Sequence, residues 1–367
     1  MSAADFSVEL GEQVHAAYAA GTPLSLRGHG TKQFCAPAAE GAALDTTAHR
    51  GIVTYEPTEL VLTARAGTPL ADIEAALAAN QQMLGFEPPH FGAGATLGGT
   101  LACGLSGPRR PYAGAARDFV LGMQIVNGKG EILRFGGQVM KNVAGYDLSR
   151  LMVGSHGTLG LILEASFKVL PKPPQETTLR FEMPADEAIH KMNVWAGQPL
   201  PVSAICHAAD TLYVRLSGAG TAVRAARLKL GGDMVDQGDD FWRALREHDH
   251  AFFRNDAPLW RLSVPSATPM LGLSGTWLLD WGGAQRWLHT SASAAEVARA
   301  AQQAGGHAQL FRQRYQVGTS YPPESTIAQL QQRLKQAFDP GAILNRSPRD
   351  AAGQVTATRA GVAQVLR

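Results

Sequence analysis

The chain of 367 residues is poor in cysteine, with three residues, Cys35, Cys103 and Cys206, and no pair at CxxC spacing. An iron–sulfur cluster usually takes four protein ligands, mostly thiolates, so we expect no cluster in this chain. The spacing also excludes a zinc finger. Scattered thiols are typical of a reducing compartment, and we therefore expect a cytoplasmic protein with three independent cysteines.

Long apolar runs and blocks of like charge are missing as well. No apolar run reaches the roughly 18 residues that a membrane span needs. The net charge is +2 and no five like charges are consecutive, so we expect no nucleic-acid partner. The N-terminal segment carries acidic residues where a secretory signal needs basic ones, and its pattern predicts an amphipathic helix.

Glycine, in contrast, is abundant, with 40 residues. Three glycine-rich stretches occupy the first half of the chain: RGHGT at 27–31, ATLGGTLACGLSG at 95–107 and GSHGTLGLI at 154–162. Glycine lets the main chain pass close to a phosphate or a flat ring, with its N–H groups pointing at the ligand. Because each stretch lies beside an apolar run, together they predict a backbone folded around a long dinucleotide.

The apolar pattern divides the chain into two domains. From Pro23 to Pro171, short strands and an amphipathic helix predict a mixed α/β domain, in which Asn127-Gly128 predicts a β-hairpin. The proline-rich segment 170–175 predicts a connector. After it, strands and helices recur twice in a similar order, which indicates a duplicated α+β domain. The predicted parts are domains at 1–171 and 176–315, a helix and turn at 322–346 that return to the first domain, and a flexible tail at 347–367.

The first glycine stretch follows a predicted strand and offers backbone donors together with Arg27 and Thr31, a composition suited to a pyrophosphate. An ordinary turn after a strand is the alternative. The stretch is not the dinucleotide fingerprint GxGxxG, because Gln33 stands where the third glycine belongs. The sequence therefore does not predict a Rossmann-type nicotinamide site.

The second stretch predicts a helix that starts at Thr96 and whose first N–H groups face an anion. Close packing of this helix against a sheet is the alternative. Arg109 and Arg110 follow, and they suit either bidentate binding of a phosphate or carboxylate or a solvated loop. Cys103 is expected to be a small buried residue rather than a reactive thiol.

The third stretch lies in a longer pattern, GYDLSRLMVGSHGTLGLI, in which Asp147 is expected to cap a short helix that ends at Gly154, before an alternating strand. With RGHGT and ATLGG upstream, this pattern resembles the FAD-binding domain of the vanillyl-alcohol oxidase and p-cresol methylhydroxylase (PCMH) superfamily. The motifs SGPRRPYAGAARDFVLG, LWRLSVP, WGGAQRWL and FDPGAILN extend the resemblance. Over nearly its whole length, the chain resembles the smaller FAD-binding subunits of bacterial glycolate oxidases (glycolate dehydrogenases).

The resemblance implies an α+β protein, with a PCMH-type FAD-binding domain and a smaller α+β cap domain that has an antiparallel sheet. It implies non-covalent FAD, because the flavin-linked histidine of covalent members aligns with Thr31. The residues that it assigns to the cofactor are Arg27, Gly28, His29, Gly30, Thr31, Thr96, Leu97, Gly98 and Gly99 at the pyrophosphate, Gly104 and Gly107 on the path to the flavin, and Gly157, Thr158, Gly160 and Ile162 near the ribityl chain and isoalloxazine.

No metal site is expected, because the histidine-rich metal motif of the related D-2-hydroxyacid dehydrogenases has no equivalent here. His248 and His250 are two residues apart on a predicted helix, so they do not share a face as metal ligands at i and i+4 would. We expect both on a solvated helix surface.

The implied reaction is the oxidation of glycolate, and of D-lactate, to the 2-oxo acid. It needs a base for the hydroxyl proton, a cation for the carboxylate and flavin N5 as hydride acceptor. Arg109, Arg110 and Lys141 are candidate cations, but no base and hence no catalytic residue is assignable.

The resemblance implies that a larger homologous FAD subunit performs the first oxidation and that an iron–sulfur subunit carries the electrons to quinone. Any membrane association would be peripheral, through the complex, at the inner face of the cytoplasmic membrane. Two alternatives stay open: a self-sufficient FAD-dependent 2-hydroxyacid dehydrogenase, and a non-catalytic scaffold subunit with a decayed FAD site.

Overall fold

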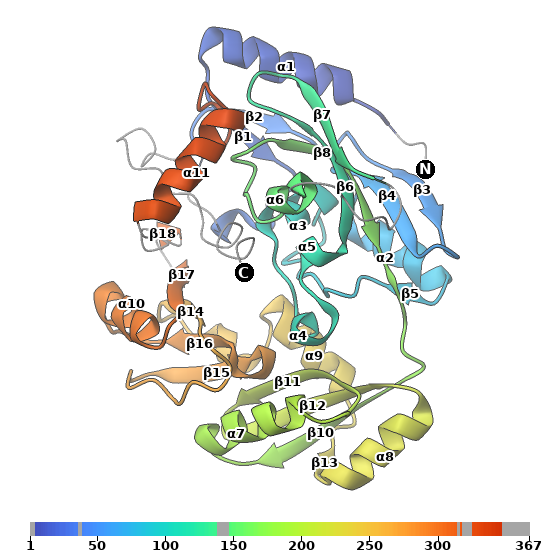
Figure 1. Cartoon of the computed structure of the whole chain (residues 1–367), viewed down its shortest axis with the longest axis vertical. Coiled ribbons are helices and arrows are strands. Elements are labelled where there is room, and N and C mark those ends of the chain that lie inside the picture. The colour runs from blue at the N-terminus through green and yellow to red at the C-terminus, as the bar shows by residue number, and fades with distance from the viewer. Residues whose placement is uncertain (1–3, 36–38, 138–146, 314–315, 318–324, 347–367) are drawn as a thin grey trace. The chain divides into compact units, whose positions relative to one another are not determined.

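The computed structural model describes residues 4–35, 39–137, 147–313, 316–317 and 325–346 (Figure 1). These residues form two compact units. Unit 1 contains the described residues of 4–105, 115–171 and 325–346, and unit 2 contains 106–114 with the described residues of 172–317. The assignment of 106–114 to unit 2 differs from the predicted continuous domain at 1–171. The predicted tail at 347–367 lies outside the described residues.

Unit 1 is built on a five-stranded antiparallel sheet in the order β3-β4-β8-β6-β7. Its strands are β3 (Ile52–Glu56), β4 (Val61–Arg65), β6 (Val120–Val126), β7 (Ile132–Gly136) and β8 (Leu161–Lys168). The pairing of β6 with β7 confirms the hairpin predicted at Asn127-Gly128. Strand β8 does not alternate as predicted, because it is the central strand and six of its eight residues are buried.

Two further strand pairs complete unit 1. Strand β1 (Leu24–Arg27) runs parallel to β2 (Ala42–Asp45), and β5 (Gln82–Met83) pairs with β9 (Leu170–Pro171), the first residues of the predicted connector. The helices of unit 1 are α1 (Ser7–Ala20), α2 (Leu70–Ala79), α3 (Leu97–Cys103), α5 (Ala116–Phe119), α6 (Leu148–Met152) and α11 (Ser325–Phe338), with the 3-10 turn η1 (Gln33–Cys35).

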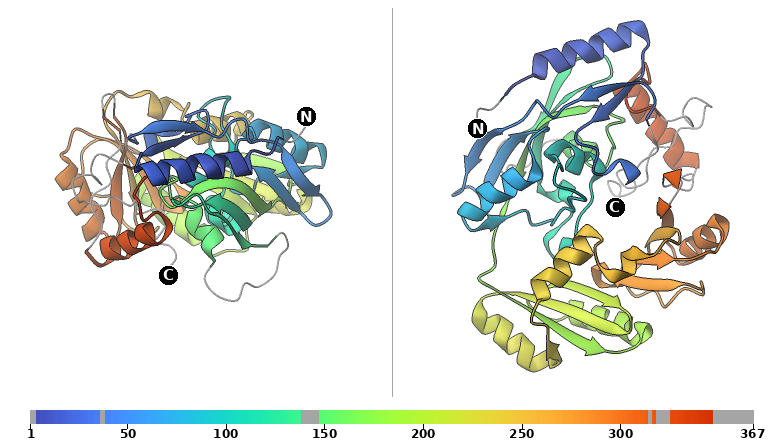
Figure 2. Two further views of the ribbon diagram at one scale, coloured as in Figure 1. Left: turned by 90° about the horizontal axis from the view of Figure 1, so that it is seen from above. Right: turned by 180° about the vertical axis from the view of Figure 1, so that it is seen from behind.

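The predicted N-terminal amphipathic helix is confirmed as α1, which lies on the outside of unit 1 in both views of Figure 2. Its buried residues Leu10, Val14 and Ala17 follow the three-and-four spacing of one helix face. They share a core with Leu161 and Leu163 of β8. The helix therefore covers one face of the sheet at the strand that follows the third glycine stretch.

Unit 2 contains a nine-stranded antiparallel sheet in the order β13-β10-β12-β11-β15-β16-β14-β17-β18. Its strands are β10 (Gln175–Glu182), β11 (Val202–Ala208), β12 (Thr211–Gly218), β13 (Asp233–Met234), β14 (Leu259–Ser263), β15 (Thr276–Asp280), β16 (Gln285–His289), β17 (His307–Gln313) and β18 (Gln316–Val317). Its helices are α4 (Arg110–Ala113), α7 (Ala185–Ala196), α8 (Gly220–Leu230), α9 (Gly238–Glu247) and α10 (Ala294–Gln303), with the 3-10 turns η2 (Ala251–Arg254) and η3 (Trp281–Gly283).

The order of the strands supports the predicted duplication. Numbered along the chain, the strands β10 to β13 lie side by side as 4-1-3-2, and β14 to β17 lie side by side as 2-3-1-4, the same order reversed. The first half has the β-α-β-β-α-β order of ferredoxin-like folds. In the second half no helix lies between β14 and β15, and the halves join where β11 pairs with β15.

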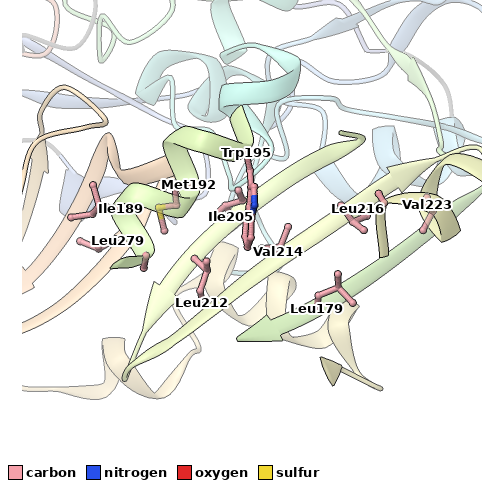
Figure 3. Close-up of a cluster of buried hydrophobic side chains, with 12 residues drawn as sticks. Leu179, Ile189, Met192, Trp195, Ile205, Leu212, Val214, Leu216, Val223 and Leu279 are labelled. Atoms are coloured by element: carbon pink, nitrogen blue, oxygen red, sulfur yellow. The ribbon is translucent and has the colours of Figure 1, made fainter. Parts of the chain in front are cut away.

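The first half of unit 2 has its core on one face of the sheet (Figure 3). Ile189 and Met192 of α7 and Val223 of α8 pack against Val214 and Leu216 of β12. On strand β10 Leu179 joins this core, while its neighbour Thr178 accepts a hydrogen bond from Trp242 of α9. Because neighbouring strand residues point to opposite faces, α9 covers the other side of the sheet.

The prediction of a solvated surface is wrong for His248. Helix α9 ends at Glu247, and His248 is its C-cap in the left-handed conformation, at φ 59°. Its ring stacks on Phe253 at 3.9 Å and meets the edge of Trp287 at 4.8 Å. Burial, with the charges of Arg312 and Arg261, holds the pKa of His248 well below its usual value. His248 is therefore a neutral residue packed among aromatic rings.

Candidate functional site

The first glycine stretch follows β1 and lies against the N-terminus of α3. A Cβ atom on Gly28 would come within 2.6 Å of Thr96 Oγ1, so glycine is needed for the two segments to touch. Gly30 has a φ of +75°, a conformation that favours glycine. Among the described residues, the N–H groups of His29, Gly30 and Thr31 donate to no protein acceptor. Three successive amides are thus available to an anionic ligand.

Helix α3 begins as predicted, with Thr96 as N-cap and its hydroxyl accepting from Gly99 N at 3.3 Å. However, the expectation that its first N–H groups face an anion is wrong for Leu97 and Gly98. Leu97 N donates to Thr68 O and Gly98 N donates to Ala66 O, at 2.9 and 2.8 Å. The alternative of close packing is confirmed here, since a Cβ on Gly98 would lie 2.7 Å from the Ala66 side chain.

The C-terminal end of α3 contacts the third glycine stretch. Gly104 caps the helix at φ +62°, and a Cβ there would lie 3.0 Å from the Gly154 Cα. Gly154 N and His156 N donate to the carbonyls of Leu101 and Ala102, at 3.0 and 2.8 Å. Asp147 caps α6 before this stretch, as predicted. Helix α3 therefore contacts the first stretch at its start and the third stretch at its end.

Asn345, which follows α11, joins the third stretch to the first. Its side chain donates to His156 O and accepts from Leu26 N, both at 2.7 Å, and Leu26 directly precedes the first stretch. A Cβ on Gly157 would come within 2.7 Å of Asn345 Nδ2. The contacts Gly28–Thr96, Gly104–Gly154, Gly157–Asn345 and Asn345–Leu26 close a circle, which we call the contact ring.

An ion pair between half-buried Lys335 and buried Asp339 supports the contact ring on the side of α11. Lys335 of α11 contacts Asp339 Oδ2 at 2.6 Å and donates to the carbonyls of Thr158 and Leu344, at 2.8 and 2.9 Å. Asp339 is fully buried and accepts from the N–H groups of Ile343 and Leu344. The pair therefore ties the third stretch to the segment that carries Asn345.

Buried polar groups near the contact ring show whether the site suits FAD. The hydroxyl oxygens of Ser155, in the third stretch, and Thr100, on α3, are buried and have no hydrogen-bond partner among the described residues. A buried hydroxyl without a partner costs free energy, which a ligand with polar atoms can offset. With the amides of 29–31, these groups are the donor set expected for phosphates and the polar edges of a dinucleotide. The residues present therefore fit FAD.

The remaining residues assigned to the cofactor have packing roles or lie elsewhere. Arg27 is exposed and its Nε donates to Ser25 Oγ at 3.2 Å. A Cβ on Gly160 would come within 2.8 Å of Ile125, and Ile162 is a buried residue of β8. Gly107 belongs to unit 2, where its carbonyl accepts from Trp281 Nε1 at 3.0 Å. The structure therefore does not bring Gly107 into the contact ring.

Two of the candidate cations, Arg109 and Arg110, contact other side chains of unit 2. Arg109 is buried and contacts Glu176 Oε1 at 2.6 Å, and Arg110 lies 4.3 Å from the centre of the Trp281 ring. The alternative of a solvated loop is therefore wrong for Arg109. These contacts hold 106–114 in unit 2. Lys141 lies outside the described residues.

The thiol of Cys103, next to Gly104 of the contact ring, is unreactive because of its environment. Cys103 is the last residue of α3, and burial raises the pKa of its thiol to about 11. At neutral pH it is therefore protonated, which agrees with the expectation of an unreactive thiol, although the residue is half-buried and not part of the core. In the described part of the chain, no group of three His, Cys, Asp or Glu residues is arranged to hold a metal ion. No helix there is long and apolar enough to span a bilayer.

Comparison with known proteins identifies the family. A protein-family model that describes an FAD-binding domain matches residues 7–136, which include the first two glycine stretches. The glycolate oxidase subunit GlcE of Escherichia coli is 50% identical over 341 residues, which are 93% of this chain and 96% of that protein. The chain belongs to the GlcE family. The cofactor of this family's domain is FAD, as predicted.

Part of a second curated protein and the fold of a solved structure are also similar to this chain. The glycolate oxidase subunit GlcD of Bacillus subtilis is 48% identical over 84 residues, 23% of this chain and 18% of that protein. A solved structure of alkyldihydroxyacetonephosphate synthase aligns with a TM-score of 0.65 at 15% identity, over 92% of this chain and 74% of that chain. With the antiparallel sheets of both units, this confirms the predicted fold class, an α+β protein with a PCMH-type FAD-binding domain.

Sequence reasoning missed two groups of residues. The sequence placed Asn345 and Asp339 only within the motif FDPGAILN, and Lys335 only within the helix predicted at 322–346, without a site role for any of them. Both act across more than 170 residues of sequence, so no local pattern marks them. In the structure Asn345 has a φ of 44°, a left-handed conformation that asparagine tolerates better than most residues.

Proposed function

We propose that the chain is the FAD-binding subunit of a multi-subunit glycolate oxidase and that the contact ring surrounds its cofactor. The amides of His29, Gly30 and Thr31 bind the pyrophosphate of non-covalent FAD. Thr96–Gly99 form the surface on which this loop rests, and 155–158 contribute the Ser155 hydroxyl and the Gly157 main chain. The observation that carries the proposal is three successive amides that have no acceptor in the described part of the chain, inside the residues matched by the FAD-binding domain.

The proposal divides the reaction between subunits. Bound FAD supplies a two-electron acceptor. In this chain Arg109 and Arg110, the predicted cations for a substrate carboxylate, are taken up by Glu176 and Trp281. We therefore assign the oxidation of glycolate, and of D-lactate, to a larger homologous FAD subunit, as the name of the GlcD relative suggests for its own complex.

An iron–sulfur subunit completes the proposed complex. Cys35, Cys103 and Cys206 lie on three separate elements, η1, α3 and β11, and three thiols are fewer than the four ligands that a cluster usually takes. Electrons would leave through the partner, and the complex would reside in the cytoplasm, with at most peripheral contact with the inner face of the membrane.

The test is the visible spectrum of the purified chain. We expect the isolated chain to bind FAD, and we expect the flavin absorbance to persist when glycolate or D-lactate is added without oxygen. Adding the larger FAD subunit should allow bleaching. Rapid bleaching of the isolated chain would instead establish a self-sufficient dehydrogenase. A colourless chain that takes up no FAD would establish a scaffold subunit, and either result refutes the proposal.

A further inference from the structure

We propose that Asn345 is a positioning residue for the cofactor: it holds the third glycine stretch in place against β1, so that FAD affinity depends on it. This inference rests on the proposed FAD site. Asn345 itself need not touch FAD. Its role would be to set the main-chain positions of 155–158 relative to 27–31.

The hydrogen bonds of Asn345 connect the two stretches directly. Its Oδ1 accepts from Leu26 N and its Nδ2 donates to His156 O, both at 2.7 Å. Its own N–H donates to Leu24 O at 2.9 Å, which fixes its backbone beside β1. One side chain thus bonds the residue two positions before Gly28 and the residue directly before Gly157. A shift of either stretch would break one of these bonds.

The chemistry of the position favours asparagine. The side chain must accept on one side and donate on the other, and an amide does both. Aspartate has the same shape but cannot donate to His156 O, and glutamine is longer by one methylene. Space is limited too, because a Cβ on Gly157 would already lie 2.7 Å from Nδ2. Asn345 and Gly157 are therefore complementary in size.

A second set of contacts holds the same stretch from α11. Lys335 donates to Thr158 O, and its partner Asp339 accepts from the N–H groups of Ile343 and Leu344, just before Asn345. The third stretch is thus held at two carbonyls, His156 O and Thr158 O, on either side of Gly157. This arrangement restricts Gly157, whose φ of +71° would otherwise be free to vary.

A purely structural role is the competing explanation, and a matched control separates the two. Thr63 Oγ1 and Ser166 Oγ form a buried side-chain bond of 2.8 Å between β4 and β8, inside the sheet of unit 1. Thr63→Val removes a buried hydrogen bond in the same unit without altering a contact of the ring. Asn345→Ala and Thr63→Val should both lower the thermal unfolding temperature.

The experiment measures FAD dissociation constants by titration of the apo-protein, with hydrogen exchange of 154–162 as a second readout. We expect Asn345→Ala and Asn345→Asp to weaken FAD binding about tenfold or more, the loss of one to two hydrogen bonds. Exchange in 154–162 should rise in both variants without FAD. Thr63→Val should leave the dissociation constant within about twofold of the wild type.

The outcomes distinguish this inference from the proposed function. If the wild type binds FAD and both Asn345 variants bind it equally well, the inference fails and the proposed function stands. Equal losses of affinity in Thr63→Val and Asn345→Ala would show a general effect of stability and also overturn the inference. If the wild type binds no FAD, the proposed function fails first. Should Asn345→Ala not fold, Asn345→Asp, which keeps the acceptor for Leu26 N, decides the question.

Discussion

Replacing Gly30 by alanine tests how the first glycine stretch works. Gly30 has a φ of +75°, and a Cβ there would lie 3.0 to 3.3 Å from the exposed side chain of Gln33, which can move aside. The cost is therefore mainly the left-handed backbone, about 1–2 kcal/mol for a residue with a Cβ. A relaxed backbone would turn the amides of Gly30 and Thr31 away from a shared ligand.

Gly21 provides a matched control in the same unit. It caps α1 at φ +64°, and a Cβ there would meet no atom within 4 Å. We expect Gly30→Ala and Gly21→Ala to lower the unfolding free energy of unit 1 by the same amount, about 1–2 kcal/mol. FAD binding should weaken about tenfold or more in Gly30→Ala alone.

The assay can separate the two units. All six tryptophans lie between 195 and 287, in unit 2. Tryptophan fluorescence in denaturant therefore follows unit 2, and far-UV circular dichroism adds the unfolding of unit 1. Both glycine variants should leave the tryptophan transition of the apo-protein unchanged. The reasoning is refuted if Gly30→Ala loses the expected stability and still binds FAD as tightly as Gly21→Ala.

Two further predictions concern pH. Hydrogen bonds from Ser7, and then Arg65, lower the pKa of Asp5 from 3.8 to about 2, so its contribution to stability is present above pH 3.8 and is lost as the pH falls toward 2. In Asp5→Asn, circular dichroism should show a smaller loss of unit 1 stability across this range, and an unchanged loss would contradict the assignment. His248 is held neutral in the fold, with a pKa well below 6.5, so unit 2 should lose stability as the pH falls below 6.5. His248→Asn, which tolerates the left-handed φ, should flatten this dependence in tryptophan fluorescence; the same slope in both proteins would count against it.

Local elements followed from the sequence because their signals are local. The Thr96 cap, the Asp147 cap, the hairpin at Asn127-Gly128 and the helix α1 each depend on residues within a few positions of one another. The repeated order of strands in unit 2 was visible for the same reason. Its sheet order, however, depends on long-range pairing, which the sequence pattern does not specify.

The site was predictable in its parts and not in its assembly. The glycines of the three stretches were assigned to close approach of a ligand, but Gly28, Gly98, Gly104 and Gly157 make room for other parts of the protein. The amides of Leu97 and Gly98 are used by carbonyls before α3, a fact that depends on how β4 is followed by α2. The composition of the stretch does not show whether its N–H groups donate to protein carbonyls or stay available to a ligand.

Long-range polar contacts and helix ends account for the other differences. The bonds from Lys335 to Thr158 and from the Asn345 side chain to His156 and Leu26 join residues 177, 189 and 319 positions apart. His248 was expected on a helix surface, but the helix ends one residue earlier and the left-handed turn directs the ring toward Phe253 and Trp287. Spacing along a predicted helix does not apply once the helix has ended.

The central claim is that 29–31 bind the pyrophosphate of FAD, and an experimental structure of the FAD complex tests it most directly. The measurement is the distance from the amide nitrogens of His29, Gly30 and Thr31 to the phosphate oxygens. We predict at least two distances within about 3.2 Å, the upper range of an N–H···O hydrogen bond. Phosphates bound elsewhere, with these amides still lacking a ligand acceptor, would contradict the account.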